Sequence, residues 1–145
     1  MLGMKSYSRD YVDACRRRVD TQLAAYRDLA AQVATGTDGG EGSGGDPLAA
    51  FAPLFFNSMV VVLDACFVHR IRAVEGKNGN PLNEVRVLAK SLLENAGVLA
   101  VDKSIKLTPE ASVLGLQAGD EVALGEADFA KLSDAFFAEI EKKFV

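Results

Sequence analysis

The stretch FAPLFFNSMVVVLDACFV, residues 51–68, carries most of the fold information in this chain of 145 residues. It is apolar on nearly every side of a helix, so it predicts a central and most buried helix in a mainly helical protein. The run approaches membrane-spanning length, but it contains Asn57, Ser58 and Asp64. Because a charge near the middle of a bilayer costs about 2.5–3.5 kcal/mol, a core helix is expected and no membrane partner.

The boundaries of this helix follow from proline, glycine and a capping acid. A short helical turn is expected to start at Pro47 after the N-cap Asp46 and to end near Pro53, which can itself begin the longer helix. The longer helix is expected to run to Glu75, because Gly76 suits the left-handed residue that follows a helix end.

Three further helices are predicted from apolar residues spaced three or four apart, in residues 8–33, 81–96 and 126–143. Asn80 is expected to cap the second of them, with Pro81 at its first position. The last is expected to bury Phe129, Leu132, Phe136, Phe137, Ile140 and Phe144. Residues 98–124 lose this period, and the segments SIKL and EVAL within them are typical of short strands. The expected fold class is mainly α. It is a four-helix bundle-like single domain of residues 1–145, with a small β-hairpin or extended flap between the third and fourth helices.

The segment TGTDGGEGSGGDP, residues 35–47, contains six glycines and no lysine or arginine. A phosphate-binding loop needs a lysine before its helix, so residues 35–46 are predicted to form a flexible Gly-rich connector.

Composition limits the partners and the compartment. The net charge of −4 argues against nucleic acid and anionic membranes, which require clustered positive charge. No apolar stretch follows the lysine near the start, so no secretory signal is expected. Cys15 and Cys66 lack CxxC spacing and are expected to be reduced, mostly buried thiols in a cytoplasmic protein.

The segment HRIRAVEGKNGNPLNEVR, residues 69–86, contains the only histidine and several arginines and asparagines. One hypothesis places a ligand site at this end of the bundle, where the N–H groups of a helix start favour an anion. Its residues would be His69, Arg72, Asn80, Asn83 and Arg86. The alternative is that these residues serve a helix end, a turn and the next helix start.

Asp64 is the polar residue of the central helix that most needs a partner. An ionised carboxylate in apolar surroundings is costly unless it is paired. The spacing predicts a structural Asp64–Arg86 pair, extended by Asn57, with Arg16 or Arg17 as the alternative partner.

Catalytic and metal chemistry find little support in the sequence. One histidine cannot supply the inward-facing ligands of a di-iron or hemerythrin-like bundle, and no G-x-S-x-G motif is present. No catalytic residue, metal ligand or cofactor is therefore expected. The leading hypothesis is a non-enzymatic binding or regulatory protein that forms a homodimer, because its apolar segments exceed what a 15.4 kDa monomer hides. A small-anion or metabolite site in residues 69–86, catalytic through His69, is the alternative.

The segments FVHRIRAVEGKNGNPLNEVR, residues 67–86, and LSDAFFAEIEKKF, residues 132–144, resemble a family of small bacterial proteins with no assigned activity. The resemblance implies a small cytoplasmic protein and brings no cofactor or catalytic residue with it.

A second resemblance is local. VDKSIKLTPEASVLGLQAGDEVAL, residues 101–124, is similar to the swapped-hairpin AbrB/SpoVT motif, which implies DNA binding. Thr108 is an extra residue before the proline, and the basic residues that would meet phosphate after Pro109 are replaced by Glu110, Ala111 and Ser112. Four positive and eight negative charges follow from Ser104 onward. This balance would repel DNA, so no nucleic-acid partner is expected.

Overall fold

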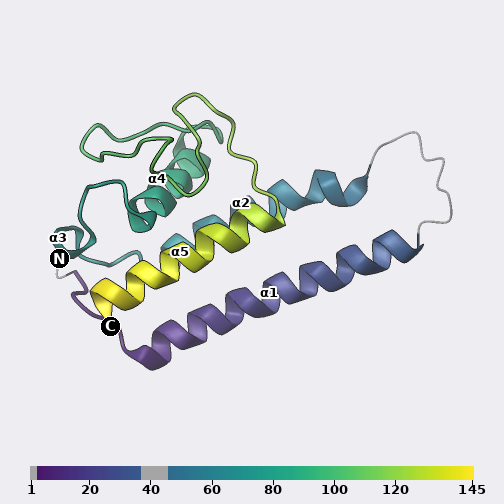
Figure 1. Ribbon diagram of the computed structural model, residues 1–145, viewed down its shortest axis with the longest axis horizontal. Helices are drawn as coiled ribbons and strands as arrows, with labels where there is room; N and C mark the ends of the chain where they lie inside the picture. The colour runs from purple at the N-terminus through teal and green to yellow at the C-terminus, as the bar shows by residue number, and fades with distance from the viewer. Residues whose placement is uncertain (1–2, 37–45) are drawn as a thin grey trace.

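The computed structural model describes residues 3–36 and 46–145, and these residues are mainly helical (Figure 1). The helices are α1 (Arg9–Gly36), α2 (Pro47–Cys66), α3 (Arg72–Glu75), α4 (Pro81–Glu94) and α5 (Glu126–Phe144). The mainly α prediction is confirmed. No strand occurs in the described residues, so the predicted β-hairpin is not found there.

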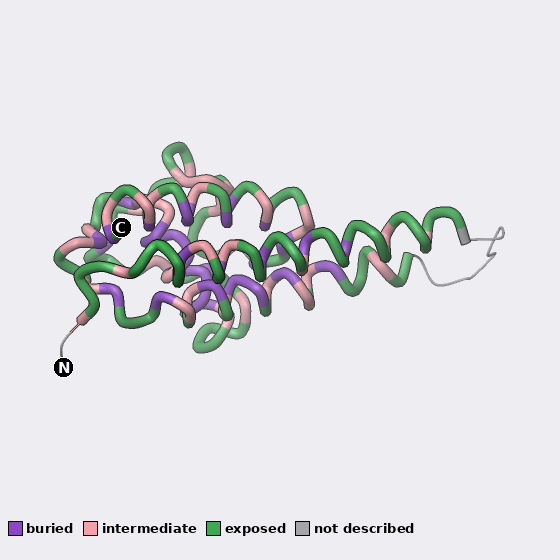
Figure 2. Tube along the Cα trace, turned by 90° about the horizontal axis from the view of Figure 1, so that it is seen from below, coloured by how far each residue is buried: buried purple, intermediate pink, exposed green. Residues whose placement is uncertain are grey.

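α2 packs against α4, α5 and α1, and α4 and α5 also pack against each other. α1 and the first part of α2 lie side by side and extend beyond the other helices (Figures 1 and 2). Residues 37–45 join these two helices and lie outside the described residues. Most of the predicted Gly-rich connector, residues 35–46, therefore lies outside the described residues. Of its remaining residues, 35 and 36 belong to the end of α1, and Asp46 is the N-cap of α2.

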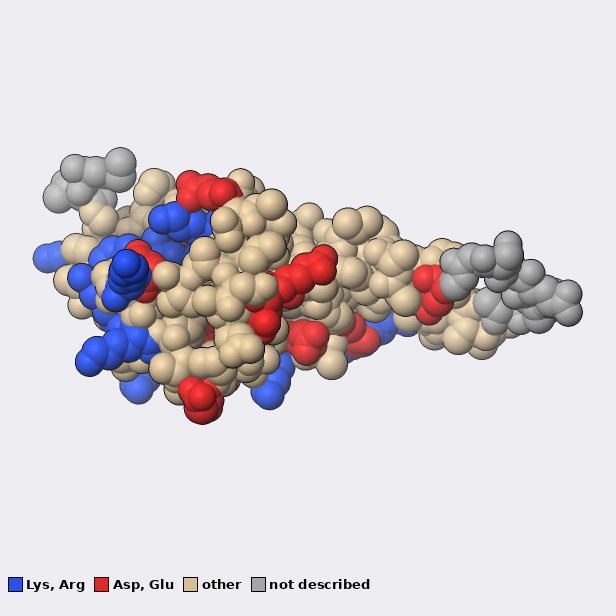
Figure 3. All heavy atoms as spheres, turned by 90° about the horizontal axis from the view of Figure 1, so that it is seen from above, with Lys and Arg blue, Asp and Glu red and all other residues tan. Residues whose placement is uncertain are grey.

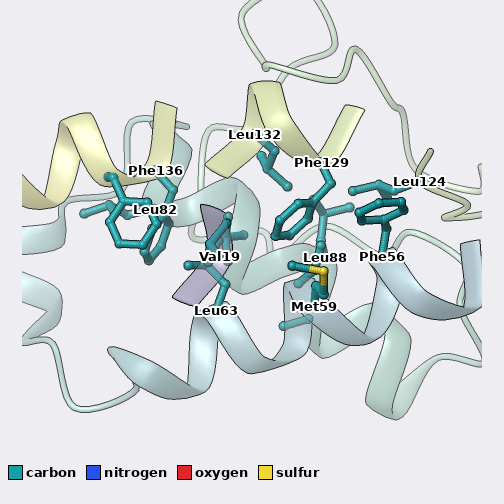
Figure 4. Packing of buried hydrophobic residues seen from close by; sticks show 14 of the residues in the cluster. Val19, Phe56, Met59, Leu63, Leu82, Leu88, Leu124, Phe129, Leu132 and Phe136 are labelled. Carbon is teal, nitrogen blue, oxygen red and sulfur yellow. The ribbon is translucent and has the colours of Figure 1, made fainter. Parts of the chain in front are cut away.

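Phenylalanine supplies much of the core. The ring of Phe56 on α2 stacks on that of Phe129 on α5, with 5.6 Å between the centroids. Leucine and methionine side chains from α2 and α4 fill the space around these rings (Figure 4). The buried stripe predicted for the last helix is confirmed at all of its positions: Phe129, Leu132, Phe136, Phe137, Ile140 and Phe144.

The predicted helix starts at Asp46 and Asn80 are confirmed. The Asp46 carboxylate accepts a hydrogen bond of 2.9 Å from the amide N of Leu48. The Asn80 side-chain oxygen accepts from the amides of Leu82 and Asn83 at 2.9 and 3.1 Å. Both caps precede a proline, whose missing N–H is not needed at the first helical position.

α2 differs from its prediction at both ends. It continues through Pro53 as one helix, so this proline interrupts the backbone hydrogen bonding locally without ending the helix. It ends at Cys66, whereas Gly76 led to a predicted end at Glu75; in the structure Gly76 instead follows the end of the short helix α3. The chain leaves α2 at Cys66 because it pairs with the N-terminal segment. The Met4 amide donates to His69 O at 2.7 Å, and the Ile71 amide donates to Met4 O at 3.0 Å.

α2 is also less buried than expected. Its inner face is in the core, but the opposite side is largely open to solvent. We call this side the outer face of α2; it comprises the exposed residues Phe51, Leu54, Ser58, Val62 and Ala65. By length and composition α2 could cross a membrane, which is weak evidence on its own because core helices of soluble proteins pass the same test. The prediction that this is the most buried helix is wrong, because α2 buries five of its 20 residues and α4 buries eight of its 14.

The segment between α4 and α5 is extended and held by isolated contacts. One antiparallel bridge joins Val98 to Glu121, and the Leu99 amide donates to Asp120 O at 2.8 Å. Beyond this bridge, the Asn57 side chain of α2 donates to Val122 O at 2.8 Å and accepts from the Leu124 amide at 3.1 Å. A side-chain amide thus takes the place that a neighbouring strand would have.

Candidate functional site

An ion-pair network lies where the end of α2, α3 and the start of α4 meet. Its centre is Glu75, which is 0% exposed. Arg86 donates to both Glu75 carboxylate oxygens, with Nη2 2.6 Å from Oε1 and Nε 3.0 Å from Oε2. Asn83 donates to Oε2 at 2.7 Å, and Arg70 Nε lies 2.7 Å from Oε1. The Arg70 contact is ionic and lacks hydrogen-bond geometry.

Asp64 belongs to the same network through Arg70. The Arg70 Nη2 atom donates to Asp64 Oδ1 at 2.9 Å and to Leu82 O at 3.1 Å. Arg70 is buried, whereas the Asp64 side chain remains 18% exposed. The predicted Asp64–Arg86 bridge is therefore replaced by two pairs, Asp64–Arg70 and Arg86–Glu75. The reason is the early end of α2, which lets Arg70 fold back toward Asp64.

The other predicted partners of Asp64 have different contacts. Arg16 lies 3.4 Å from an oxygen of Asp134 and 3.5 Å from one of Glu141, both on α5. Asn57 binds the backbone at Val122 and Leu124 and does not extend the Asp64 bridge.

The charges of this network stabilise each other. Burial disfavours the ionised form of Glu75, but hydrogen bonds from Arg86 and Asn83 and the charge of Arg70 outweigh it and lower the Glu75 pKa. Burial likewise disfavours the cation of Arg86, and its hydrogen bonds with Glu75, together with the charge of Asp64, raise its pKa. Glu75 and Arg86 therefore both remain charged at neutral pH.

The two asparagines of the predicted ligand site bind the protein itself. The Asn80 side-chain nitrogen donates to Glu75 O at 2.8 Å while its oxygen caps α4. The Asn83 oxygen accepts from the Gly79 amide at 3.0 Å, and its nitrogen donates to Glu75 and to Gly76 O. These contacts use the polar atoms of both side chains, so neither is free for a ligand.

Arg72 and Arg86 reach a cleft of about 640 Å³, which we call the α4 cleft. Its basic residues are Arg72, Arg86 and Lys90, and its acidic residues are Asp64, Glu94 and Asp102. Apolar side chains of α4 and of residues 100–105 complete its walls. On the face shown in Figure 3, lysine and arginine gather at the end of the molecule away from the α1–α2 connection.

His69 lies elsewhere. It is exposed and lines a second cleft of about 480 Å³, the N-terminal cleft, together with Met4, Tyr7, Ser8, Tyr11 and Cys66. The structure therefore divides the five predicted ligand residues. Arg72 and Arg86 share one cleft, His69 lines another, and Asn80 and Asn83 support the chain between α3 and α4.

Glu84 and Glu75 are buried acids whose partners the sequence patterns do not indicate. The Glu84 carboxylate accepts from the amides of Val113 and Leu114 at 2.7 and 3.0 Å and so anchors the segment between α4 and α5. An acid in the first turn of a helix is already explained by its favourable interaction with the helix dipole. Its position in the sequence therefore gave no sign that Glu84 also binds the segment between α4 and α5. Glu75 could have been recognised only if the end of α2 had been placed at Cys66.

In residues 3–36 and 46–145, no group of three or more His, Cys, Asp or Glu side chains is arranged to hold a metal ion. Comparison of the chain with protein-family models, with curated proteins and with solved structures gives no match.

Proposed function

We propose that the protein is a non-enzymatic binding or regulatory protein of the cytoplasm that self-associates through the outer face of α2. One observation carries this proposal. Leu54 is 71% exposed, Val62 48% and Phe51 43%, all on one side of a helix that has no charged residue before Asp64. A continuous exposed apolar face of this kind marks a contact surface, since isolated monomers seldom expose one. In this proposal the four long helices act as one bundle-like domain, with the segment between α4 and α5 as a flap.

A second copy of the chain is the partner that the chemistry of the face favours. A two-fold interface places the same patch on both subunits, so an uncharged apolar stripe is complementary to itself. The small residues Ser58 and Ala65 lie on this stripe and allow two helices to approach closely. The Ser58 hydroxyl donates to Leu54 O at 3.0 Å, so its burial would not leave an unpaired donor.

The dimensions of the face suit a small stable interface. A helix of 20 residues is roughly 30 Å long and 10 Å wide. The neighbouring α1 packs beside α2 and carries an exposed leucine, Leu29. Two adjacent helices offer roughly 600 Å², which approaches the roughly 800 Å² per partner of a standard interface.

Light scattering over a range of protein concentrations tests the proposal. The wild type should form a dimer. Leu54→Glu should weaken it by at least about 100-fold, because each copy would bury an unpaired carboxylate. Leu93→Glu is the matched control, since Leu93 is 70% exposed on α4, and it should leave the dimer intact.

Two outcomes would contradict self-association. One is a wild-type monomer at every concentration. The other is a monomer that floats with phosphatidylglycerol vesicles and loses this binding in Leu54→Glu, which would assign the outer face to a lipid surface. Unchanged thermal unfolding of Leu54→Glu would show that the variant still folds.

A second candidate function is the binding of a small anionic metabolite in the α4 cleft. The observation that favours it is Arg72, an exposed side chain at this cleft without an ion-pair partner among the described residues. Arg86 and Lys90 would add positive charge on the same side. The three acids of the cleft favour ligands that also carry an amino group or another donor.

A thermal-shift screen with phosphate, nucleotides, carboxylates and amino acids tests this candidate. A ligand of the cleft should raise the melting temperature of the wild type and not of Arg72→Gln. Arg17→Gln removes an exposed arginine from α1 and should behave like the wild type. A shift that both variants keep would place the ligand elsewhere, and no shift with any compound would remove the candidate.

A further inference from the structure

Two cysteines from distant parts of the chain meet between α1 and α2. Tyr11, Cys15 and Arg18 are four and three residues apart, so they share one face of α1. The Tyr11 hydroxyl donates to Cys66 O, and Arg18 Nη1 lies 3.9 Å from Cys66 Sγ. Cys15 lies between Tyr11 and Arg18 on this face of α1, so its side chain faces the end of α2 beside Cys66.

The two thiols differ in access. Cys15 is 5% exposed and belongs to the core, whereas Cys66 is partly exposed and lines the N-terminal cleft. Both are free thiols. A reagent from solvent therefore reaches Cys66 first, and Cys15 is held behind it.

We propose that Cys66 and Cys15 form a redox-active dithiol that is oxidised by a low-molecular-weight disulfide such as oxidised glutathione. The Cys66 thiolate attacks one sulfur of the reagent, which breaks its S–S bond and releases one thiolate. Cys15 then loses its proton and attacks the Cys66 sulfur, which releases the second thiol. In total, two protein thiols are oxidised to a Cys15–Cys66 disulfide, and the reagent is reduced to two thiols.

The charges around Cys66 set the rate of the first step. Burial and the neighbouring Cys15 raise the pKa of Cys66, and the Arg18 guanidinium opposes this shift by favouring the thiolate. Arg18 is therefore the side chain on which the reaction rate should depend. Burial and contact with Cys15 raise the pKa of Tyr11 to about 12, so its hydroxyl stays protonated and keeps its bond to the Cys66 carbonyl.

The proposal is independent of self-association and fits a cytoplasmic protein, in which disulfides are usually transient and redox-sensing. The new bond would fix α1 to the last residue of α2 and close a long loop. It should raise the melting temperature by roughly 5–15 °C, because it constrains the unfolded chain.

Intact-mass analysis of the reduced protein during incubation with oxidised glutathione tests this proposal. The wild type should lose two hydrogen atoms and retain no glutathione. Cys15→Ala should retain one glutathione at Cys66, and Cys66→Ala should stay unmodified because Cys15 is buried. Arg18→Gln should give the same product as the wild type at a lower rate. The rate should fall about threefold for each unit by which the substitution raises the Cys66 pKa, because less thiolate is present. Arg17→Gln is the matched control and should react at the wild-type rate.

Three results would overturn the proposal: a wild type that keeps a glutathione adduct as Cys15→Ala does, a disulfide between two molecules, or no reaction of the wild type. If Cys15→Ala does not fold, tryptic digestion of the oxidised wild type without reduction still tests for the Cys15–Cys66 disulfide. The peptide of residues 10–16 must then be joined to the peptide of residues 28–70, and two separate modified peptides would contradict the intramolecular bond.

Discussion

At the scale of single residues, Glu75 is the most consequential side chain of the network. Glu75→Ala would leave Arg70 and Arg86 without their shared carboxylate and should lower the free energy of unfolding by about 3–5 kcal/mol. Glu75→Gln should cost less, because its amide oxygen can still accept a hydrogen bond. Asp64→Ala should cost about 1–2 kcal/mol, since Arg70 keeps its contacts with Glu75, Phe67 O and Leu82 O.

Urea unfolding followed by circular dichroism measures this order. The exposed His69 should tolerate alanine within about 0.5 kcal/mol, because its contact with Met4 uses only the backbone. Glu110→Ala, an exposed acid in the segment between α4 and α5, is the control for loss of a surface charge. An Asp64→Ala cost equal to that of Glu75→Ala would show that the network is not centred on Glu75.

At the scale of elements, the turn between α3 and α4 depends on Gly79. Its φ is +84°, and a Cβ there would lie 2.2 Å from the carbonyl oxygen of Lys106. Gly79→Ala should therefore cost about 3 kcal/mol or more, combining left-handed strain with displacement of the backbone. Gly119, with φ of +95° and open space around its Cβ position, isolates the strain alone. Gly119→Ala should cost about 1 kcal/mol, and equal melting temperatures for the two variants would refute the close approach.

The two hydrogen bonds accepted by Glu84 lead to a second prediction at this scale. Glu84→Gln can accept only through one oxygen, so it should release the Val113 or Leu114 amide. Hydrogen exchange at these two amides should become faster, whereas exchange in the centres of α2 and α5 should change little. Glu94→Gln, an exposed acid on α4, should leave exchange at both amides unchanged. Faster exchange throughout the chain would instead indicate global destabilisation.

Local chemistry explains which elements could be predicted. The caps at Asp46 and Asn80 and the apolar stripe of α5 depend on neighbouring residues, and the sequence predicts them correctly. The end of α2 depends on Met4, which pairs with His69 and Ile71 more than sixty residues away in sequence. Helical periodicity cannot detect such a partner. The same error explains the wrong ion pair, because a helix that continues to Glu75 includes Arg70 and does not let its side chain fold back to Asp64.

The outer face of α2 shows a second limit of prediction from sequence. An apolar side chain in a sequence does not reveal whether its own domain, a second subunit or a lipid covers it. Asn57 is a related case, because its amide binds the backbone near Val122 where the prediction expected a neighbouring strand. Burial and strand pairing thus depend on contacts between distant parts of the folded chain, and amino-acid composition alone does not determine them.

At the scale of the whole molecule, the lowered pKa of Glu75 predicts acid sensitivity. A carboxyl whose pKa is lower in the folded state stabilises the protein above its unfolded-state pKa, and this stabilisation is lost as the pH falls through the folded-state value. The free energy of unfolding should therefore decrease as the pH falls below about 4.5, the ordinary value for Glu75. Urea titrations from pH 7 downward measure this decrease. Glu75→Gln should have a shallower decline, and an identical slope in both proteins would assign the acid sensitivity to other carboxyls.

The hydrogen bond from the Tyr7 amide to Phe144 O, 2.7 Å long, has a consequence for synthesis in the cell. Its two residues are 137 positions apart, so at roughly 5–20 residues per second Tyr7 waits roughly 7–27 s for its partner to be translated. The ring of Tyr7 also packs against Phe67 and Phe144, and only Phe67 is made early. Nascent chains therefore carry an unfinished aromatic cluster on the ribosome, where general chaperones that recognise aromatic segments can bind it before the fold closes.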